Sequence, residues 1–363
     1  MARRNWDKDQ RLLRRSNTTT LKPSRGGAVL FMVSQTCQDK LLRGRAFVWE
    51  WRMRNTITVM NAKGGVGKST LVLALAETLA AYHGKSVLVI DADAQASISH
   101  LLVRQPQLEA AQSGGRTIVD YLIGAVLKES TTNWREFVLA DVSDVDDARS
   151  IALMPSDTAL TLFEREVSKG EHESRLRKII GAWLAEASSS FDIVLIDSAP
   201  GLSVLTECFL REAGFYLSPT KPDLISTRGL KFLREFKERD PQMGFAENLG
   251  VVINMKDALS AQDEQFDQWL RQQPANRCFH QSIPRVGALQ ATGFISPHSR
   301  SYWAKYPGET GEHLRHLTLE LVGRVEGEII EADQTEEIPG ARAKRSEGKV
   351  KSMWGALKER RVQ

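Results

Sequence analysis

The sequence contains few cysteines, few aromatic residues and no long apolar run. Its 363 residues include three cysteines, and aromatic residues make up 7% of the chain. Cys37, Cys208 and Cys278 are far apart and odd in number, which argues against a disulfide framework and a paired-cysteine metal site. No apolar run reaches about 18 residues, and the first residues lack the apolar stretch of a signal peptide. We therefore expect a cytoplasmic protein without membrane spans.

Charge is distributed unevenly along the chain. The formal net charge is +4, but residues 1–52 carry twelve Lys/Arg against four Asp/Glu, and residues 340–363 carry eight against two. The part between them therefore has a net charge of −10. An acidic body with basic ends is typical of a folded domain with interaction tails or disordered extensions. We predict a folded body over 53–335, a basic and poorly ordered extension over 1–52, and a basic tail over 336–363.

The extension over 1–52 lacks the periodic pattern of the body. It contains arginine clusters, three consecutive threonines and the aromatic stretch FVWEW shortly before Met53. Met53 would be a natural start just before the first predicted strand, so one hypothesis is that 1–52 is not translated in the cell. The intact mass of the native protein tests it. The alternative is a DNA-binding arm, although no two helices joined by a turn are recognisable there.

From residue 55 onward, short β-rich runs alternate with helical patterns. The predicted strands are 56–60, 86–91, 151–155, 191–197, 215–218 and 250–254, and a final helix is expected around 309–328. Runs that are apolar at successive positions are typical of parallel strands buried on both faces. The alternation predicts an α/β fold with a doubly wound, mostly parallel sheet and helices on both faces. Ligands bind such sheets at the carboxyl ends of the strands.

The segment NAKGGVGKSTL, residues 61–71, lies between the first predicted strand and a helical pattern. A glycine-rich loop in this place directs backbone N–H groups at phosphate oxygens, and the following helix adds the positive end of its dipole. Lys68 can then reach the β- and γ-phosphates, and Ser69 can offer its hydroxyl to Mg²⁺. The fold is therefore predicted to be that of a P-loop nucleoside triphosphatase. The predicted nucleotide-binding residues of the loop are Gly64, Gly65, Val66, Gly67, Lys68, Ser69 and Thr70.

The loop also carries an earlier lysine, Lys63, and has Ala62 where such loops usually open with glycine. In these respects it resembles the deviant phosphate-loop ATPases, the group of the ParA partition proteins and the MinD positioning proteins, whose loop reads KGGxGK[ST]. The resemblance implies that Lys63 reaches across a sandwich dimer to the phosphates of the partner's nucleotide. A catalytic cation supplied in trans makes dimerisation and ATP occupancy depend on each other. The alternative is a solvated loop lysine, whose replacement by alanine would leave dimerisation unchanged.

Acidic residues follow two of the predicted strands. The segment DADAQ, residues 91–95, resembles the family's DxDPQ with alanine in place of proline, and Asp197 ends another strand. The resemblance implies that Asp93 orients or activates the attacking water and that Asp91 supports the metal and the loop. It also implies that Asp197 serves Mg²⁺ together with Ser69, and we assign Ser69, Asp91 and Asp197 to the metal site. Carboxylates at the mouth of a phosphate site repel nucleotide unless a cation lies between them, which favours a metal there.

Further segments over about 55–330 resemble ParA more than MinD. They are TIVDYL (117–122), MPS (154–156), DSAP (197–200), ISTRGL (225–230), VIN (252–254) and IPR (283–285). The resemblance places Asn254 where the family has the amide that reads adenine, and we assign Pro284 to the same nucleotide site. An amide can pair with the adenine edge at two points. The alternative for Asn254 is a turn residue at a strand end.

ParA-type proteins bind DNA without sequence preference when they are dimeric with ATP. In this chain the helical pattern after Gly229 has an apolar face made of Phe232, Leu233 and Phe236. The opposite face carries basic residues at a spacing of three: Lys231, Arg234 and Lys237. We predict DNA contact along this stripe. The alternative is an ordinary solvated face, because Glu235 and Glu238 dilute its charge.

The basic tail contains a second pattern that bears on partners. Val350, Met353, Trp354 and Leu357 have helical spacing among lysines and arginines, and MinD-type relatives place a similar helix on anionic membranes. Glycines on both sides of Met353 weaken such a helix, and its apolar stripe spans only about two turns. A disordered basic tail is the preferred interpretation, and membrane binding through it remains the alternative.

Together these patterns favour a ParA-like, Mg²⁺-dependent ATPase that forms a homodimer with ATP and binds nucleoid DNA non-specifically. It would position a plasmid, a chromosome or another cargo, with slow basal hydrolysis accelerated by a ParB-like centromere-binding protein. The alternatives are a MinD-like membrane-associated ATPase and a metabolic ligase of the same fold. An iron–sulfur reductase is disfavoured by the placement of the cysteines. An inactive scaffold is disfavoured because Lys68, Ser69, Asp93 and Asp197 are all present.

Overall fold

The structure, a computed structural model, describes residues 55–239, 244–285, 287, 289 and 295–327. The expectations for the extension over 1–52 and for the tail over 336–363 lie outside these residues. Within the described part of the chain, no helix is long and apolar enough to cross a membrane.

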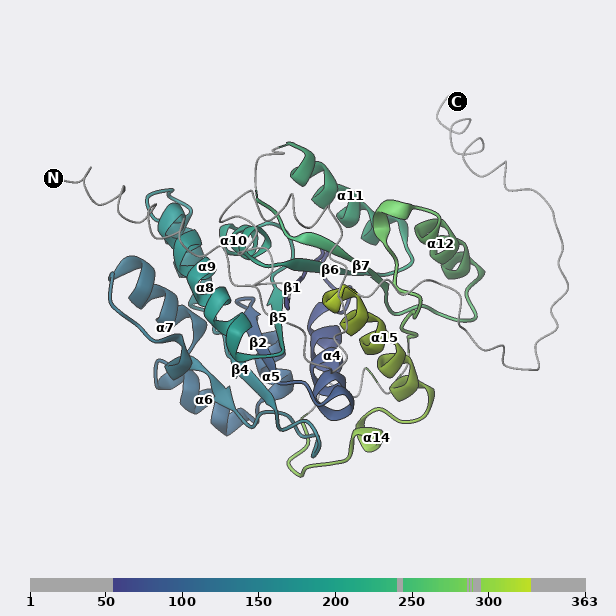
Figure 1. Cartoon of the computed structure of the whole chain (residues 1–363), viewed down its shortest axis with the longest axis horizontal. Helices are drawn as coiled ribbons and strands as arrows, with labels where there is room; N and C mark the ends of the chain where they lie inside the picture. Colours follow the sequence, from purple (N-terminus) through teal and green to yellow (C-terminus); the bar gives the residue numbers. More distant parts are fainter. Residues whose placement is uncertain (1–54, 240–243, 286, 288, 290–294, 328–363) are drawn as a thin grey trace, which may run out of the picture. The chain divides into compact units, whose positions relative to one another are not determined.

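The described residues form a seven-stranded sheet in the order β3-β4-β2-β5-β1-β6-β7 (Figure 1). The strands are β1 (Thr56–Val59), β2 (Val87–Ala92), β3 (Leu139–Ala140), β4 (Ile151–Met154), β5 (Ile193–Ser198), β6 (Phe215–Thr220) and β7 (Glu247–Ile253). All neighbours pair in parallel except β3, which is antiparallel to β4 at one edge. The predicted mostly parallel sheet is confirmed. In the register, Val59 pairs with Asp197, so the loop after β1 begins beside the carboxyl end of β5.

Helices cover both faces of this sheet. They are α4 (Lys68–His83), α5 (Ser97–Leu102), α6 (Gln105–Ser113), α7 (Ile118–Leu122), α8 (Leu160–Val167), α9 (Glu173–Ser190), α10 (Val204–Glu212), α11 (Leu224–Arg239), α12 (Ala261–Arg271), α14 (Tyr302–Lys305) and α15 (Glu309–Glu326). A short π-helix (Ile123–Leu127) and two 3₁₀-helices (Trp134–Phe137 and Pro274–Asn276) complete the described elements.

Strand β2 shows why the predicted strands are apolar at successive positions. Val87 and Val89 belong to the hydrophobic core that includes residues of α4 and α15. Leu88 and Ile90 belong to a second core, with residues of α7, α9 and α10. Because successive side chains of a strand point to opposite faces, a strand covered on both sides needs an apolar residue at each of these positions.

Helix α4 is the most deeply enclosed element next to the phosphate loop. Eleven of its sixteen residues are buried, and in Figure 1 it runs beside α15. A helix that is apolar on all sides is stable only when it is covered on all sides. This burial fixes the first residue of α4, Lys68, at the carboxyl edge of the sheet.

Candidate functional site

The loop between β1 and α4 is built around Gly67. Its φ of 84° lies in the left-handed region that glycine tolerates best. A Cβ at this position would lie 2.6 Å from Nδ2 of Asn254, so only glycine allows this approach. The Asn254 amide in turn donates to the Val66 carbonyl at 2.9 Å and accepts the N–H of Met255 at 3.0 Å. The residue predicted to read adenine therefore also holds the phosphate loop in place. Among the described residues, the second amide hydrogen and the second oxygen lone pair of Asn254 have no hydrogen-bond partner.

The loop lines an open cleft of about 490 Å³. The cleft is lined by Gly64, Gly65, Gly67, Lys68, Ser69, Thr70, Asp93, Gln95, Ser97, His100, Leu101 and Pro200. The structure thus brings the predicted phosphate-binding loop and Asp93 together, with Val66 as a buried exception that can contribute only its backbone. Sequence reasoning missed the α5 residues Ser97, His100 and Leu101. Their spacing of three and four directly after DADAQ is a helical signal that would have predicted a shared face.

Lys68 and Asp197 form the buried centre of the site. Lys68 is 7% exposed, and burial lowers the pKa of its ammonium group although the charges of Asp197 and Asp93 act in the opposite direction. Asp197 is fully buried at the end of β5, and burial together with the charge of Asp91 raises its pKa. Lys68 and the nearby Ser69 hydroxyl oppose that rise.

Neither oxygen of Asp197 has a hydrogen-bond partner among the described residues. Ser69 is close enough to affect its pKa but does not meet hydrogen-bonding geometry. Buried polar atoms are nearly always paired, so an unpaired carboxylate needs an explanation. A carboxylate and a hydroxyl next to a phosphate site are oxygen ligands of the kind that Mg²⁺ prefers. The residues present therefore fit the predicted metal.

Asp91 is also fully buried, but its oxygens are occupied. They accept hydrogen bonds from the Ser99 hydroxyl at 2.7 Å, the Ser99 N–H at 3.0 Å and the Asp93 N–H at 3.2 Å. Burial raises the pKa of Asp91, and these bonds oppose the rise. The contacts tie α5 and the loop after β2 to the sheet. They favour the supporting role predicted for Asp91 over direct coordination of a metal.

Asp93 lies at the surface of the cleft rather than in its buried centre. It is half-buried, and its Oδ1 accepts the N–H of Gln95 at 2.9 Å, which fixes the side chain in the turn after β2. Because Lys68 and Asp93 line the same cleft, phosphates and a water molecule could be held between them.

Lys63 occupies a different environment from Lys68. It is absent from the residues that line the phosphate cleft. Its Nζ donates to the Ser226 hydroxyl at 3.2 Å and lies 3.5 Å from Oδ1 of Asp223, at the start of α11. Burial alone would raise the pKa of Asp223, but bonds from Ser226 and the charge of Lys63 hold it below its usual value. The two lysines of one loop therefore lie in different surroundings.

A second, narrower pocket of about 60 Å³ opens beside Thr70. Its lining is mostly apolar and consists of Thr70, Leu71, Ala74, Asn254, Met255, Ile283, Pro284, Arg285, Leu289 and Leu314. It brings together Asn254 and Pro284, which are thirty residues apart in the sequence. An apolar pocket with one amide at its edge has the chemistry of a site for a nucleotide base.

The predicted apolar face of helix α11 is only partly covered. The helix begins at Leu224 and contains Gly229, where a Cβ would lie 2.2 Å from Oδ1 of Asn61. Among the residues of that face, Leu233 is buried and Phe232 is 45% exposed. Adjacent residues of a helix are about 100° apart, and the narrow contact surface of α11 covers only one of them.

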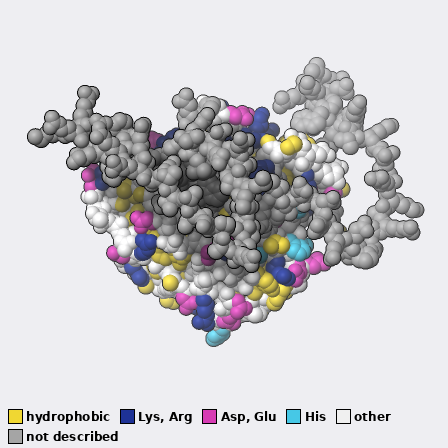
Figure 2. Space-filling model, viewed as in Figure 1, with side chains coloured by type: hydrophobic (Ala, Val, Ile, Leu, Met, Phe, Trp, Pro, Cys, Tyr) yellow, Lys and Arg dark blue, Asp and Glu magenta, His cyan; other side chains and the backbone are white. Residues whose placement is uncertain are grey.

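The three basic residues predicted as a DNA stripe each have a contact within the protein. Lys231 forms an ion pair with Glu235 at 3.4 Å, and Lys237 lies 5.6 Å from the centre of the Phe245 ring. Arg234 is half-buried and donates to Oδ1 of Asn276 at 3.2 Å. On the part of the described surface visible in Figure 2, basic and acidic side chains are interspersed. DNA contact through these residues remains a prediction.

Comparisons with known proteins agree with the geometry. Residues 54–243, slightly more than half of the chain, match the AAA domain family. The chromosome partitioning protein ParA of Caulobacter vibrioides is 29% identical over 249 residues, covering 66% of this chain and 85% of that protein. A ParA family protein of Chlamydia muridarum is 31% identical over 203 residues, covering 55% of this chain and 71% of that protein. The chain belongs to the ParA family.

Solved structures similar to this ParA family chain share its fold. The structure of pNOB8 ParA bound to nonspecific DNA is 21% identical, has a TM-score of 0.56 and covers 75% of this chain and 99% of its own. Cobyrinic acid a,c-diamide synthase of Mycobacterium smegmatis, with bound ADP and magnesium, is 20% identical with a TM-score of 0.56, covering 75% of this chain and 95% of its own. These likenesses establish the P-loop ATPase fold. The sequence relatives, not the fold, separate a partition ATPase from a ligase.

Proposed function

We propose that this chain is a Mg²⁺-dependent ATPase whose ATP-bound form is a dimer that binds DNA without sequence preference. The observation that carries the proposal is the division between the two lysines of one loop. Lys68 is buried beside Asp197 at the phosphate cleft, whereas Lys63 is held by Asp223 and Ser226 outside that cleft. Because Lys63 does not line the phosphate cleft of its own subunit, it would reach a second copy by exchanging its contacts with Asp223 and Ser226 for that copy's nucleotide.

Within one subunit, the loop backbone and Lys68 would hold the phosphates of ATP. Ser69 and Asp197 would hold Mg²⁺, which when bound neutralises phosphate charge. Asp93, fixed by the Gln95 N–H, would orient the attacking water. The apolar pocket beside Thr70 would take the adenine, with Asn254 reading its edge and Pro284 forming a wall. Asp93, Asp197 and Asn254 lie at or beside the carboxyl ends of β2, β5 and β7, and Lys68 and Ser69 begin α4.

Lys63 would complete the site of the partner subunit. Because each site then needs the other subunit, ATP binding and dimerisation favour each other by the same factor. Hydrolysis would remove the γ-phosphate, so Lys63 would lose part of its contact with the partner's nucleotide and the dimer would be less stable. A switch of this kind must hold its state, so we propose a slow basal rate that a ParB-like partner increases.

The proposed cargo and location follow the relatives. The Caulobacter vibrioides protein is described as a chromosome partitioning protein, and pNOB8 ParA has been solved on nonspecific DNA. We propose by analogy that this chain acts in the cytoplasm on nucleoid DNA and positions a plasmid, a chromosome or another cargo. The basic ends of the chain would add charge attraction to DNA in any nucleotide state.

The experiment is binding of the full chain to an unrelated DNA duplex over a range of salt concentrations, with Mg²⁺ and either ATP or ADP. We expect tighter binding in ATP than in ADP, and binding by Lys63→Ala in ATP that is no tighter than wild-type binding in ADP. The matched control is Lys85→Ala, because Lys85 is 28% exposed and ion-paired with Glu326 at 3.0 Å, much as Lys63 is 32% exposed and paired with Asp223. The control variant should bind like the wild type.

Equal binding in ATP, in ADP and in Lys63→Ala would contradict the proposal. It would mean that the basic ends bind DNA by charge alone, and anionic vesicles would then test the MinD-like alternative. Absence of both DNA and vesicle binding, with normal ATP hydrolysis, would instead favour a metabolic ligase.

A further inference from the structure

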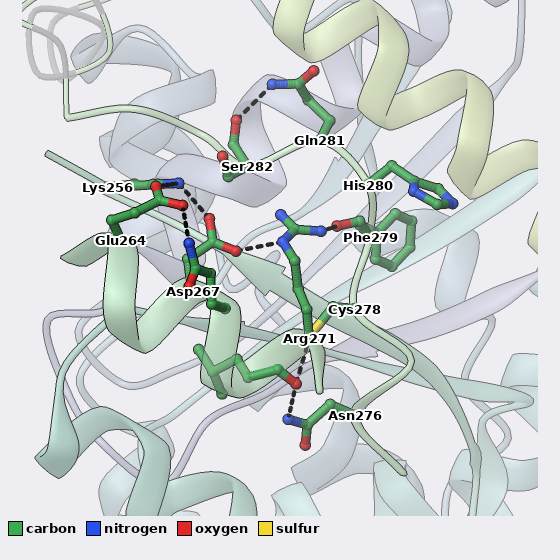
Figure 3. A network of polar contacts seen from close by, with 12 residues as sticks. Lys256, Glu264, Asp267, Arg271, Asn276, Cys278, Phe279, His280, Gln281 and Ser282 are labelled. Atoms are coloured by element: carbon green, nitrogen blue, oxygen red, sulfur yellow. Dashed lines mark hydrogen bonds and ion pairs between the residues drawn. The ribbon is translucent and has the colours of Figure 1, made fainter. Parts of the chain in front are cut away.

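Figure 3 shows an ion-pair network around Lys256, which directly follows Met255 of the pocket proposed for the base. At its centre is Asp267 of α12, whose side chain is 5% exposed. Its Oδ2 pairs with Nζ of Lys256 at 2.5 Å, and its Oδ1 accepts a hydrogen bond from Nε of Arg271. Glu264 also pairs with Lys256, at 2.9 Å, but its side chain is 53% exposed. Asp267 is therefore the buried anion that joins two cations.

Lys256 and Arg271 each connect Asp267 to a wall of the base pocket, one wall containing Asn254 and the other Pro284. Lys256 follows Asn254 and Met255, and its N–H donates to the Ile283 carbonyl at 3.0 Å. Its carbonyl accepts the N–H of Arg285 at 2.8 Å. The wall containing Asn254 is thus joined by backbone hydrogen bonds to the wall containing Pro284.

Arg271 holds the second wall at its other end. Its Nη1 donates to the Phe279 carbonyl at 2.8 Å, where the segment leading to Pro284 begins. The Phe279 N–H is bonded to the Val251 carbonyl of β7 at 2.9 Å. Asp267 therefore restrains the segment from Phe279 to Pro284 through Arg271, and the turn after β7 through Lys256.

That turn contains a strained residue in contact with the phosphate loop. Met255 has a φ of 55°, an uncommon conformation for a residue with a side chain. Its Cε lies 2.8 Å from the place that a Cβ of Gly67 would occupy. Such conformations persist only where the surroundings over-determine them, and they are frequent at ligand sites. The Lys256–Asp267 pair, one residue further along, supplies such a restraint.

We infer that Asp267 is a positioning residue for the nucleotide base. It sets the affinity for adenine nucleotides by fixing both walls of the pocket, and it contacts neither the phosphate cleft nor the reacting atoms. This inference rests on the proposed nucleotide site. Its consequence is specific: loss of Asp267 weakens the part of binding that depends on the base and leaves the part that depends on the phosphates.

The test measures binding to the full chain by calorimetry in Mg²⁺, with ADP as one probe and inorganic tripolyphosphate as the other. We expect Asp267→Asn to weaken ADP about tenfold, the effect of losing one buried charged hydrogen bond, with tripolyphosphate affinity unchanged. In steady-state hydrolysis the same variant should raise KM for ATP and keep kcat, as expected when only uniform binding is lost. Glu264→Gln, which alters the exposed pair, should stay within about twofold of the wild type.

A second variant covers the case in which Asp267→Asn does not fold. Arg271→Lys keeps a cation beside Asp267 but loses the fork that also reaches the Phe279 carbonyl. It should weaken ADP and spare tripolyphosphate, by a smaller factor. Unchanged ADP affinity in either folded variant, or an equal loss for both probes, would overturn the inference. A wild-type protein that binds neither probe would overturn the proposed function itself.

Discussion

Helix α4 carries one buried ionic cluster at its first residue and another just past its middle, and the two clusters differ in completeness. The first contains Lys68 and Asp197, and neither oxygen of Asp197 has a partner among the described residues. The second lies nine residues further along the helix, about 13 Å away. There Lys305 donates to Oε1 of Glu77 at 2.7 Å and to Oδ1 of Asp144 at 2.6 Å. Tyr306 donates to the other oxygen of Glu77 at 2.6 Å.

The pKa shifts of Asp144 and Asp197, one carboxyl from each cluster, have opposite signs. Burial alone would raise the pKa of Asp144, but the charge and hydrogen bond of Lys305 hold it below the usual value. Burial raises the pKa of Asp197, and the charge of Asp91 raises it further. In the second cluster the buried charges have partners, and we expect this network to stabilise the fold by holding α14 against α4. An incomplete one is expected where a ligand supplies the missing charge.

Among substitutions in the two clusters, Lys305→Met is expected to have the largest effect on the free energy of unfolding. It leaves the buried Glu77 carboxylate without its cation and Asp144 with Arg300 as its remaining cation, and breaking a buried pair in this way costs about 3–5 kcal/mol. Urea unfolding should show that loss in the free energy of unfolding. Lys85→Met, which breaks the more exposed pair with Glu326, is the matched control and should change it by less than about 1 kcal/mol. If Lys305→Met changes the free energy of unfolding by a similarly small amount, the second cluster does not stabilise the fold.

Asp197→Asn should raise the free energy of unfolding, whereas Lys305→Met lowers it. The same variant should strongly reduce ATP hydrolysis. Hydrolysis of ATP should fall about a hundredfold or more, because the proposed Mg²⁺ site would lose a carboxylate ligand worth several kcal/mol in the transition state. Without Mg²⁺ or nucleotide, the free energy of unfolding near pH 8 should rise by about 1 kcal/mol or more, since one unit of pKa shift corresponds to about 1.4 kcal/mol. Stability falls with rising pH when the folded state binds the proton more tightly.

The pH profile separates this explanation from a general packing effect. A carboxyl whose pKa is raised by folding loses stability as pH rises from its ordinary pKa near 4 towards neutral pH. The gain of Asp197→Asn should therefore be small near pH 4 and grow towards pH 8. If Asp197→Asn raises the free energy of unfolding equally at all pH values, or lowers it at pH 8, the ionised Asp197 carboxylate does not destabilise the fold.

The two clusters also differ in how well the sequence predicts them. The first was predicted because its residues lie in contiguous motifs after strands, in 61–71, 91–95 and 197–200. The second has no local motif: Lys305 is 228 residues from Glu77 and 161 from Asp144 in the sequence. Only the packing of α14 on α4 joins them.

The same distinction explains other differences from the predictions. Strands with continuous apolar runs were recognised, but β3, with two residues at the sheet edge, has no periodicity to recognise. The spacing of α11 predicted an apolar face but not how much of it is covered, and Phe232 is 45% exposed. The network of Lys256, Asp267 and Arg271 depends on tertiary contacts and gave no signal in the sequence.

The central claim is that one loop serves two sites, with Lys68 in its own subunit and Lys63 in the partner's. The most direct test is the molar mass in solution by light scattering, with Mg²⁺ and either ADP or a slowly hydrolysed ATP analogue. We predict a monomer with ADP and a dimer with the analogue for the wild type and for Lys85→Ala. Lys63→Ala should bind the analogue and remain a monomer. A Lys63→Ala protein that dimerises with the analogue as the wild type does would contradict the claim.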